Sequence, residues 1–121
     1  METRGHRELV CWQRSMDLAE MIYKISNDFP DREKFGLSSQ MRRAAVSVPS
    51  NIAEGHGAGG GNYVRHLDIA YGSLMELQTQ AELAGKIGFI HEDILTPLMS
   101  AIDLTIKPLS GLRKAIREKS R

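Results

Sequence analysis

Apolar residues recur along the chain with the spacing of an α-helix, and the first such stretch covers residues 9–29. Its apolar positions follow one another at intervals of three and four: Leu18, Ile22, Ile25 and Phe29. Because an α-helix has about 3.6 residues per turn, this spacing places them on one face. The sequence therefore predicts a first helix over residues 9–29, closed by Pro30, since a residue before proline resists helical geometry.

The second stretch covers residues 37–54 and contains a proline. Its apolar positions are Leu37, Met41, Ala44, Ala45, Val48 and Ile52. Pro49 removes one backbone hydrogen bond, so we expect a kink there rather than an end. Gly55 is expected to end this helix. The glycine-rich segment 55–62 is then expected to be a mobile loop, with Asn62 as the cap of the next helix.

Two longer stretches, residues 63–86 and 91–118, complete the pattern. The apolar positions of the first are Leu67, Ala70, Leu74, Leu77, Ala81 and Ala84. Those of the second are Leu95, Leu98, Ile102, Leu109, Leu112 and Ile116, with Thr105 in the missing place. Gly88 is expected to cap the C-terminal end of the third helix. In the fourth, the apolar period continues past Pro108, which predicts a second kink. This helix begins near His91 or, as an alternative, at Thr96 with Pro97 in its first turn.

The links between these helices are short, and no stretch has the alternation of a strand. Four amphipathic helices with short links favour an antiparallel arrangement. The sequence therefore predicts an all-α, up-and-down four-helix bundle, with residues 1–121 forming a single domain.

Composition narrows the class of protein. The 121 residues are 41% hydrophobic and 26% charged, as in a globular domain. No uncharged stretch approaches the roughly 18 residues that a membrane-spanning helix needs, and the charged opening segment does not resemble a secretory signal. The single cysteine, Cys11, cannot form an internal disulfide. We therefore expect a cytoplasmic protein that does not contact a membrane.

The residues that could carry chemistry do not form a working motif. Gly55-x-Gly57-x-x-Gly60 matches the dinucleotide-binding motif in its letters, but that motif needs a preceding β-strand. No two of the four histidines lie three or four residues apart, so no helix presents two imidazoles to one metal ion. The sequence therefore predicts no catalytic residue, no cofactor and no metal, and the protein is not expected to be an enzyme.

A polar stripe accompanies the apolar one on helix 37–54. Its members, with those expected to face them from helix 63–86, are Arg43, Ser47, Ser50, Asn51, Glu54, Ser73, Glu76 and Gln80. In an antiparallel hairpin, Asn51 is expected to lie close to His66. The stripe is either a solvated face or a half-buried set between helices or subunits. In the second case we expect Arg43 to pair with Glu76, because buried charges need partners.

The C-terminal end is basic, although the net charge of the chain is only +1. From residue 107 onward, six basic residues stand against the single acid Glu118, and the candidates for contact with nucleic acid are Arg113, Lys114, Arg117, Lys119 and Arg121. Such an end is either an ordinary solvated helix terminus, favoured by the helix dipole, or a patch for a polyanion.

Several segments resemble the four-helix-bundle proteins of the 23S rRNA intervening-sequence family. They are Trp12-Gln13, Phe29-Pro30, FGLSSQMRRAAVSVPSNIAEG at residues 35–55, and IAYGSLMELQTQ at residues 69–80. The resemblance implies an up-and-down bundle that assembles as a homopentamer and has no enzymatic activity. It also implies a distant relationship to the accessory variability determinant of diversity-generating retroelements, which engages nucleic acid and a reverse transcriptase. Residues 58–61 depart from the family, whose members usually have an arginine and a hydroxyl residue there.

Two functions follow from these observations. The first is a non-catalytic oligomeric scaffold, a pentamer of this chain, that associates with RNA or a nucleoprotein. The alternative is a protein–protein adaptor with no nucleic-acid contact, which the near-neutral charge favours. A ring needs two different apolar patches on each copy, and Met21, Ile69 and Met75 are apolar residues outside the core stripes.

Overall fold

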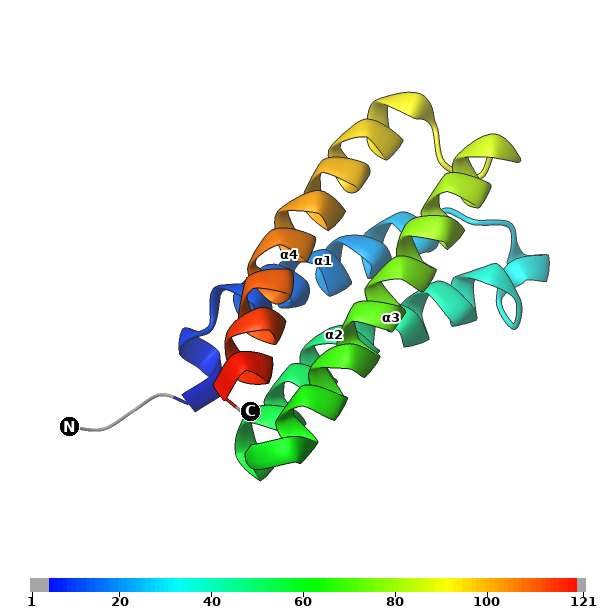
Figure 1. The fold of residues 1–121 in the computed structure, drawn as a ribbon. Coiled ribbons are helices and arrows are strands. Elements are labelled where there is room, and N and C mark those ends of the chain that lie inside the picture. Colours follow the sequence, from blue (N-terminus) through cyan, green and yellow to red (C-terminus); the bar gives the residue numbers. More distant parts are fainter. Residues whose placement is uncertain (1–4, 120–121) are drawn as a thin grey trace.

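The computed structural model describes residues 5–119 and contains four long α-helices (Figure 1). They are α1 (Val10–Ser26), α2 (Leu37–Ala58), α3 (Gly60–Lys86) and α4 (Glu92–Lys119), and short 3-10 turns lie at Gly5–Glu8 and Asp31–Glu33. No strand occurs in residues 5–119. The all-α fold predicted from the apolar spacing is confirmed.

Each helix of the bundle packs against two neighbours. α1 contacts α2 and α4, and α3 contacts the same two helices. Within the described residues, no such contact joins α1 to α3 or α2 to α4. Figure 1 shows successive helices running in opposite directions, so the start of α1 and the end of α4 lie at the same end of the bundle.

Aliphatic side chains fill the space between the helices. The largest fully buried ones are Leu18, Ile22, Met41, Ile52, Leu67, Leu74, Leu77, Leu98, Ile102 and Leu109. All of them belong to the apolar stripes read from the sequence, and burying one such side chain stabilises the fold by about 1.5–3 kcal/mol. Thr105 fills a gap in the α4 stripe, and its hydroxyl donates to the Ala101 carbonyl at 2.9 Å, which satisfies it inside the core.

The prolines lie inside the helices. α2 continues through Pro49, and α4 begins at Glu92, ahead of the alternative start at Thr96, and continues through Pro97 and Pro108. The kinks at Pro49 and Pro108 stay predictions. No helix in residues 5–119 is long and apolar enough to cross a membrane.

The C-terminal end of α3 is closed at Gly88, as the sequence predicted. Gly88 has a φ of +85°, which favours glycine. The Phe89 N–H donates to the Ala84 carbonyl at 2.8 Å, and the Gly88 N–H donates to the Gly85 carbonyl at 3.2 Å. These two bonds are those of a Schellman motif, and they satisfy carbonyls that the helix end would leave open.

The glycine-rich segment is helical, and the prediction of a mobile loop over residues 55–62 was wrong. α2 continues past Gly55 to Ala58, and Gly59 is the single residue between α2 and α3. Asn62 therefore lies inside α3 and does not cap it, because the residue before the helix is Gly59, with a φ of +70°.

The position of Gly55 gives a physical reason for this difference. A Cβ atom at this position would lie 2.8 Å from the Cβ atom of His66 and 3.1 Å from the Tyr63 ring. The glycine therefore allows α2 and α3 to approach closely over the last turn of α2. It serves packing between helices rather than a helix end.

Candidate interaction surfaces

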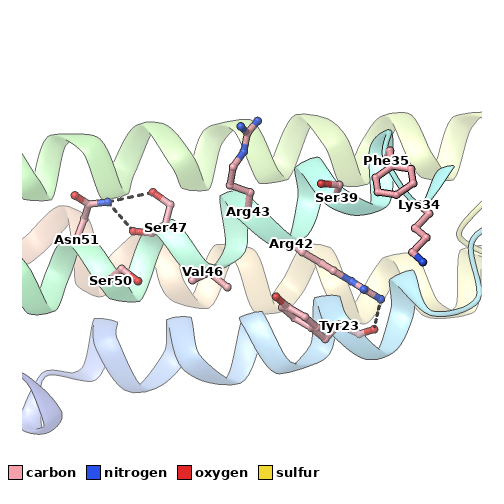
Figure 2. Close-up of a pocket in the computed structure, with 10 residues that line it drawn as sticks. All are labelled: Tyr23, Lys34, Phe35, Ser39, Arg42, Arg43, Val46, Ser47, Ser50 and Asn51. Carbon is pink, nitrogen blue, oxygen red and sulfur yellow. Dashed lines mark hydrogen bonds between the residues drawn. The ribbon is translucent and has the colours of Figure 1, made fainter.

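Polar side chains of α2 and α3 form a chain of hydrogen bonds along the seam between the two helices. Ser73 Oγ lies 2.8 Å from Ser47 Oγ. Asn51 Nδ2 donates to the Ser47 carbonyl at 2.9 Å and to Ser47 Oγ at 3.1 Å (Figure 2). His66 Nδ1 lies 2.9 Å from Asn51 Oδ1. The expected proximity of Asn51 and His66 is therefore present.

The bonds of this chain share one direction. Because the Asn51 amide nitrogen donates to a carbonyl, its Oδ1 is left to accept, and His66 must donate from Nδ1. A neutral His66 ring then carries its acceptor lone pair on Nε2. Glu54 Oε2 lies 3.6 Å from the same Nδ1 and becomes an ion-pair partner when the ring is protonated. The chain thereby fixes the register of α2 against α3.

The charged members of the predicted polar stripe lie outside this chain. Arg43 and Glu76 are both exposed, and no ion pair joins them within residues 5–119. Glu76 instead accepts a long hydrogen bond of 3.4 Å from Gln80 on its own helix. Within one chain the two charges are therefore exposed to water and not paired, and a pair buried between subunits stays a prediction.

An acid of α3 holds two of the basic residues that were expected to contact nucleic acid. Arg113 Nη2 and Arg117 Nη2 both donate to Asp68 Oδ1, at 2.9 and 2.8 Å. The Arg113 guanidinium also lies 4.1 Å from the centre of the Tyr71 ring. These contacts clamp the end of α4 onto α3, and the shared carboxylate offsets part of the positive charge.

The remaining candidates of this basic end are less constrained. Lys114 and Lys119 are exposed and form no ion pair in the part of the chain that the structure describes. Arg121 lies outside the described residues. The C-terminal end therefore presents less uncompensated charge than its sequence suggests.

A groove of about 510 Å³ runs along the outer side of α1 and α2, and we call it the α1–α2 groove. Its lining is mostly apolar: Trp12, Met16, Ala19, Tyr23, Val46, Pro49 and Ala53, with His6, Glu20 and Ser50. Met16 is 45% exposed, and Tyr23 and Val46 are similar. The residues expected to form a second apolar patch behave differently, because Met21 and Met75 pack against the core and Ile69 alone is exposed.

A second exposed apolar surface runs along α4. Ile94, Pro97 and Leu104 are exposed there at intervals of three and seven residues, which places them on one side of the helix. We call this side the α4 ridge. The molecule therefore has two different apolar surfaces, on different helices.

A wider cavity of about 690 Å³ lies beside the groove, at the start of α2 (Figure 2). It is lined by Tyr23, Lys34, Phe35, Ser39, Arg42, Arg43, Val46, Ser47, Ser50 and Asn51, and we call it the cationic cavity. Three of these side chains are positively charged and none is negatively charged. Sequence reasoning missed this cavity, although the Arg42-Arg43 pair and an aromatic residue in the preceding link were visible signals.

The nucleophilic and metal-binding side chains are dispersed. Burial raises the pKa of the Cys11 thiol to about 11, so it is protonated at neutral pH. His56 lies beside the rings of His6 and Tyr63, at 6.4 and 5.8 Å between ring centres. Within residues 5–119, no three His, Cys, Asp or Glu side chains are placed to hold a metal ion together.

Comparison with known proteins bears on the fold and on the family. A solved structure from Bacteroides thetaiotaomicron, a protein of unknown function from the S23 ribosomal protein family, is 22% identical with a TM-score of 0.79. The alignment covers 87% of this chain and 96% of that chain, and at this identity the likeness concerns the fold alone. The comparison with curated proteins finds no match. The model of the 23S rRNA-intervening sequence protein family matches residues 7–111. This chain therefore belongs to the 23S rRNA-intervening sequence protein family.

Proposed function

We propose that this protein is a non-catalytic scaffold that assembles from copies of itself through the α1–α2 groove. The observation that carries the proposal is the groove itself, because Met16, Tyr23 and Val46 stay exposed there after the four helices have filled their own core. Each Å² of apolar surface removed from water contributes about 25 cal/mol, so covering such a surface favours association.

The other side of the proposed interface is the α4 ridge of a second copy. A groove on α1 and α2 and a ridge on α4 are different surfaces, so their contact is head-to-tail. Head-to-tail contacts close into a ring when the rotation between copies divides a full turn. The number five, and the relationship to the accessory variability determinant, rest on the family resemblance and belong to this proposal.

Light scattering after size-exclusion chromatography tests the assembly. The 13.5 kDa chain is expected to elute at a multiple of its mass, and Met16→Glu, which puts a charge into the groove, is expected to reduce it to one copy. Leu83→Glu is the matched control, because Leu83 is 48% exposed on α3, outside both surfaces. A wild-type chain that elutes as a monomer at about 50 µM would overturn the proposal, since a stable scaffold binds more tightly than that.

Association with RNA or a nucleoprotein in the cytoplasm is the finer part of the proposal. The ion pairs of Arg113 and Arg117 with Asp68 weaken the support for RNA binding at the C-terminal end. Lys114, Lys119 and Arg121 remain as the candidate contacts there. RNA affinity is expected to fall as salt rises, and to fall further in Lys114→Ala/Lys119→Ala. If no RNA binds at low salt, the adaptor without nucleic-acid contact is the better function. Protein partners that stay bound after nuclease treatment of a lysate would then identify it.

A further inference from the structure

We propose that Trp12 and Tyr23 of the α1–α2 groove donate hydrogen bonds to two main-chain carbonyl groups on α4 of a second copy. These are the carbonyls that the prolines of α4 leave without a donor. The inference rests on the proposed self-assembly, and it names the contacts that set how α4 of one copy lies in the groove of the next.

The groove contains two aromatic hydrogen-bond donors, the indole N–H of Trp12 and the hydroxyl of Tyr23. Within residues 5–119 these two residues form hydrogen bonds through their main chains alone. Trp12 is half-buried and Tyr23 is 45% exposed, so water can serve as the acceptor in a single copy. A second copy that covers the groove removes this water, and a buried donor without an acceptor costs free energy. The covering surface therefore has to supply acceptors.

Neighbouring groups hold both aromatic rings in place. The centre of the Trp12 ring lies 5.1 Å from that of the His6 ring, in an edge-on arrangement. The Arg42 guanidinium lies 4.8 Å from the centre of the Tyr23 ring, and Figure 2 shows these two side chains together between α1 and α2. Arg42 is itself held by Asn27 Oδ1, to which its Nη2 donates at 2.8 Å. Donors held in this way lose less conformational entropy on binding.

Two carbonyl groups of α4 lack the donor that a regular helix supplies. In an α-helix each carbonyl accepts a hydrogen bond from the N–H four residues later. Pro97 has no N–H, so the Asp93 carbonyl loses this donor. Pro108 has the same effect on the carbonyl of Leu104. Asp93, Pro97 and Leu104 are exposed, so the otherwise apolar α4 ridge also carries main-chain acceptors.

The spacing of the donors equals the spacing of the acceptors. Trp12 and Tyr23 lie 11 residues apart on α1. Asp93 and Leu104 also lie 11 residues apart, on α4. Eleven residues make about three turns, or roughly 16 Å, so each pair lies on one side of its helix. An α4 that lies along the groove can therefore satisfy both donors at once, in either direction.

Sedimentation velocity over a dilution series measures the concentration at which half of the protein is assembled. Tyr23→Phe removes only a hydroxyl and is expected to raise this concentration about fivefold, the net effect of one hydrogen bond. Tyr71→Phe removes a hydroxyl of α3 outside both surfaces and is the matched control, with a change below about twofold expected. Pro97→Ala and Pro108→Ala each return an N–H to the helix, so each is expected to weaken assembly without lowering the Tm.

Double-mutant cycles separate the hydrogen bonds from the apolar contact. Added to one of the two proline variants, Tyr23→Phe is expected to raise the concentration by less than about twofold, because the hydroxyl has already lost its acceptor. Trp12→Phe is expected to couple in the same way to the other proline, and the pairing gives the direction of α4. Ile94→Ala removes apolar surface from the ridge but no acceptor, so its effect is expected to multiply with that of Tyr23→Phe.

Three results would overturn the inference while self-assembly stands. The first is a Tyr23→Phe variant that assembles like Tyr71→Phe. The second is an effect of Tyr23→Phe that multiplies in full with those of both proline variants. The third is coupling of Tyr23→Phe to Asp103→Ala, which would assign the acceptor to an exposed carboxylate of α4. In all three the wild type assembles and Met16→Glu does not, whereas a wild type that stays monomeric at about 50 µM would remove the proposed function as well.

Discussion

Burial decides the chemistry of Cys11, the single cysteine of the chain. Its side chain is 2% exposed in the core, and desolvation raises its pKa from 9.0 to about 11. The thiolate is therefore disfavoured in the folded state. The same group in the unfolded chain loses its proton near its ordinary pKa. Between these two pKa values, the folded state therefore binds the thiol proton of Cys11 more tightly than the unfolded chain does.

This difference predicts how stability depends on pH. The contribution of the Cys11 thiol is fully present below about pH 9 and is lost as pH rises towards the folded pKa of about 11. We expect the wild type to lose about 2 kcal/mol more unfolding free energy between pH 8 and pH 11 than Cys11→Ala does, measured by urea unfolding. Parallel pH curves for the two proteins would contradict this account. The other titrating groups are present in both, and the pKa of Tyr63, raised by burial and then by the Cys11 thiolate, adds to the same difference.

Single residues also show which features of the interaction surfaces could be predicted from the sequence alone. The neighbourhood of Asn51 and His66 followed from the register of an antiparallel hairpin. Which basic side chains lack an ion-pair partner could not be predicted in this way, because Arg113 and Arg117 are held by Asp68, 45 and 49 residues away along the chain. Arg42 is oriented by two neutral residues, Ser26 at the end of α1 and Asn27 directly after it. Tertiary contacts of this kind leave no spacing in the sequence.

At the scale of elements, the helices were the predictable part, and the turn between α2 and α3 was not. Apolar periodicity is a property of one helix, so it could be read from its own residues. Glycine costs a helix up to about 1 kcal/mol per residue, and the density of glycines in segment 55–61 therefore predicted a loop. The close approach of α3 overrides this preference, and that approach depends on residues outside the segment.

Substitutions at two glycines in the last turns of α2 distinguish the effect of close packing from that of helix propensity. At Gly55 a Cβ would meet the Cβ of His66 at 2.8 Å, whereas at Gly57 no heavy atom lies within 4 Å. Gly55→Ala is therefore expected to destabilise the fold by about 1–3 kcal/mol. Gly57→Ala is expected to stabilise it by about 0.4–1 kcal/mol through reduced freedom of the unfolded chain. Thermal unfolding of both variants measures whether each substitution raises or lowers stability. A loss of stability in both would argue that the segment is not helical.

At the scale of the whole molecule, the clamp on Asp68 joins the last turns of α4 to the bundle. Asp68→Asn removes the shared charge that holds Arg113 and Arg117. Because this network is partly exposed, we expect a loss of about 1 kcal/mol at low salt that shrinks as salt screens the charges. Urea unfolding at low and high salt measures it, with Asp103→Asn, an exposed acid of α4 with no ion pair in residues 5–119, as control. Equal losses in both variants would show that the clamp contributes nothing.

The one-residue link at Gly59 has a kinetic consequence for the molecule. Closing so short a connection between α2 and α3 costs little chain entropy, and the contacts across it are local in sequence. The hairpin of α2 and α3 is therefore the part of the chain expected to be structured in the transition state for folding, before α1 and α4 dock. Substitutions in its seam, such as Ser47→Ala, would then slow refolding, whereas substitutions near the end of α4 would mainly speed unfolding.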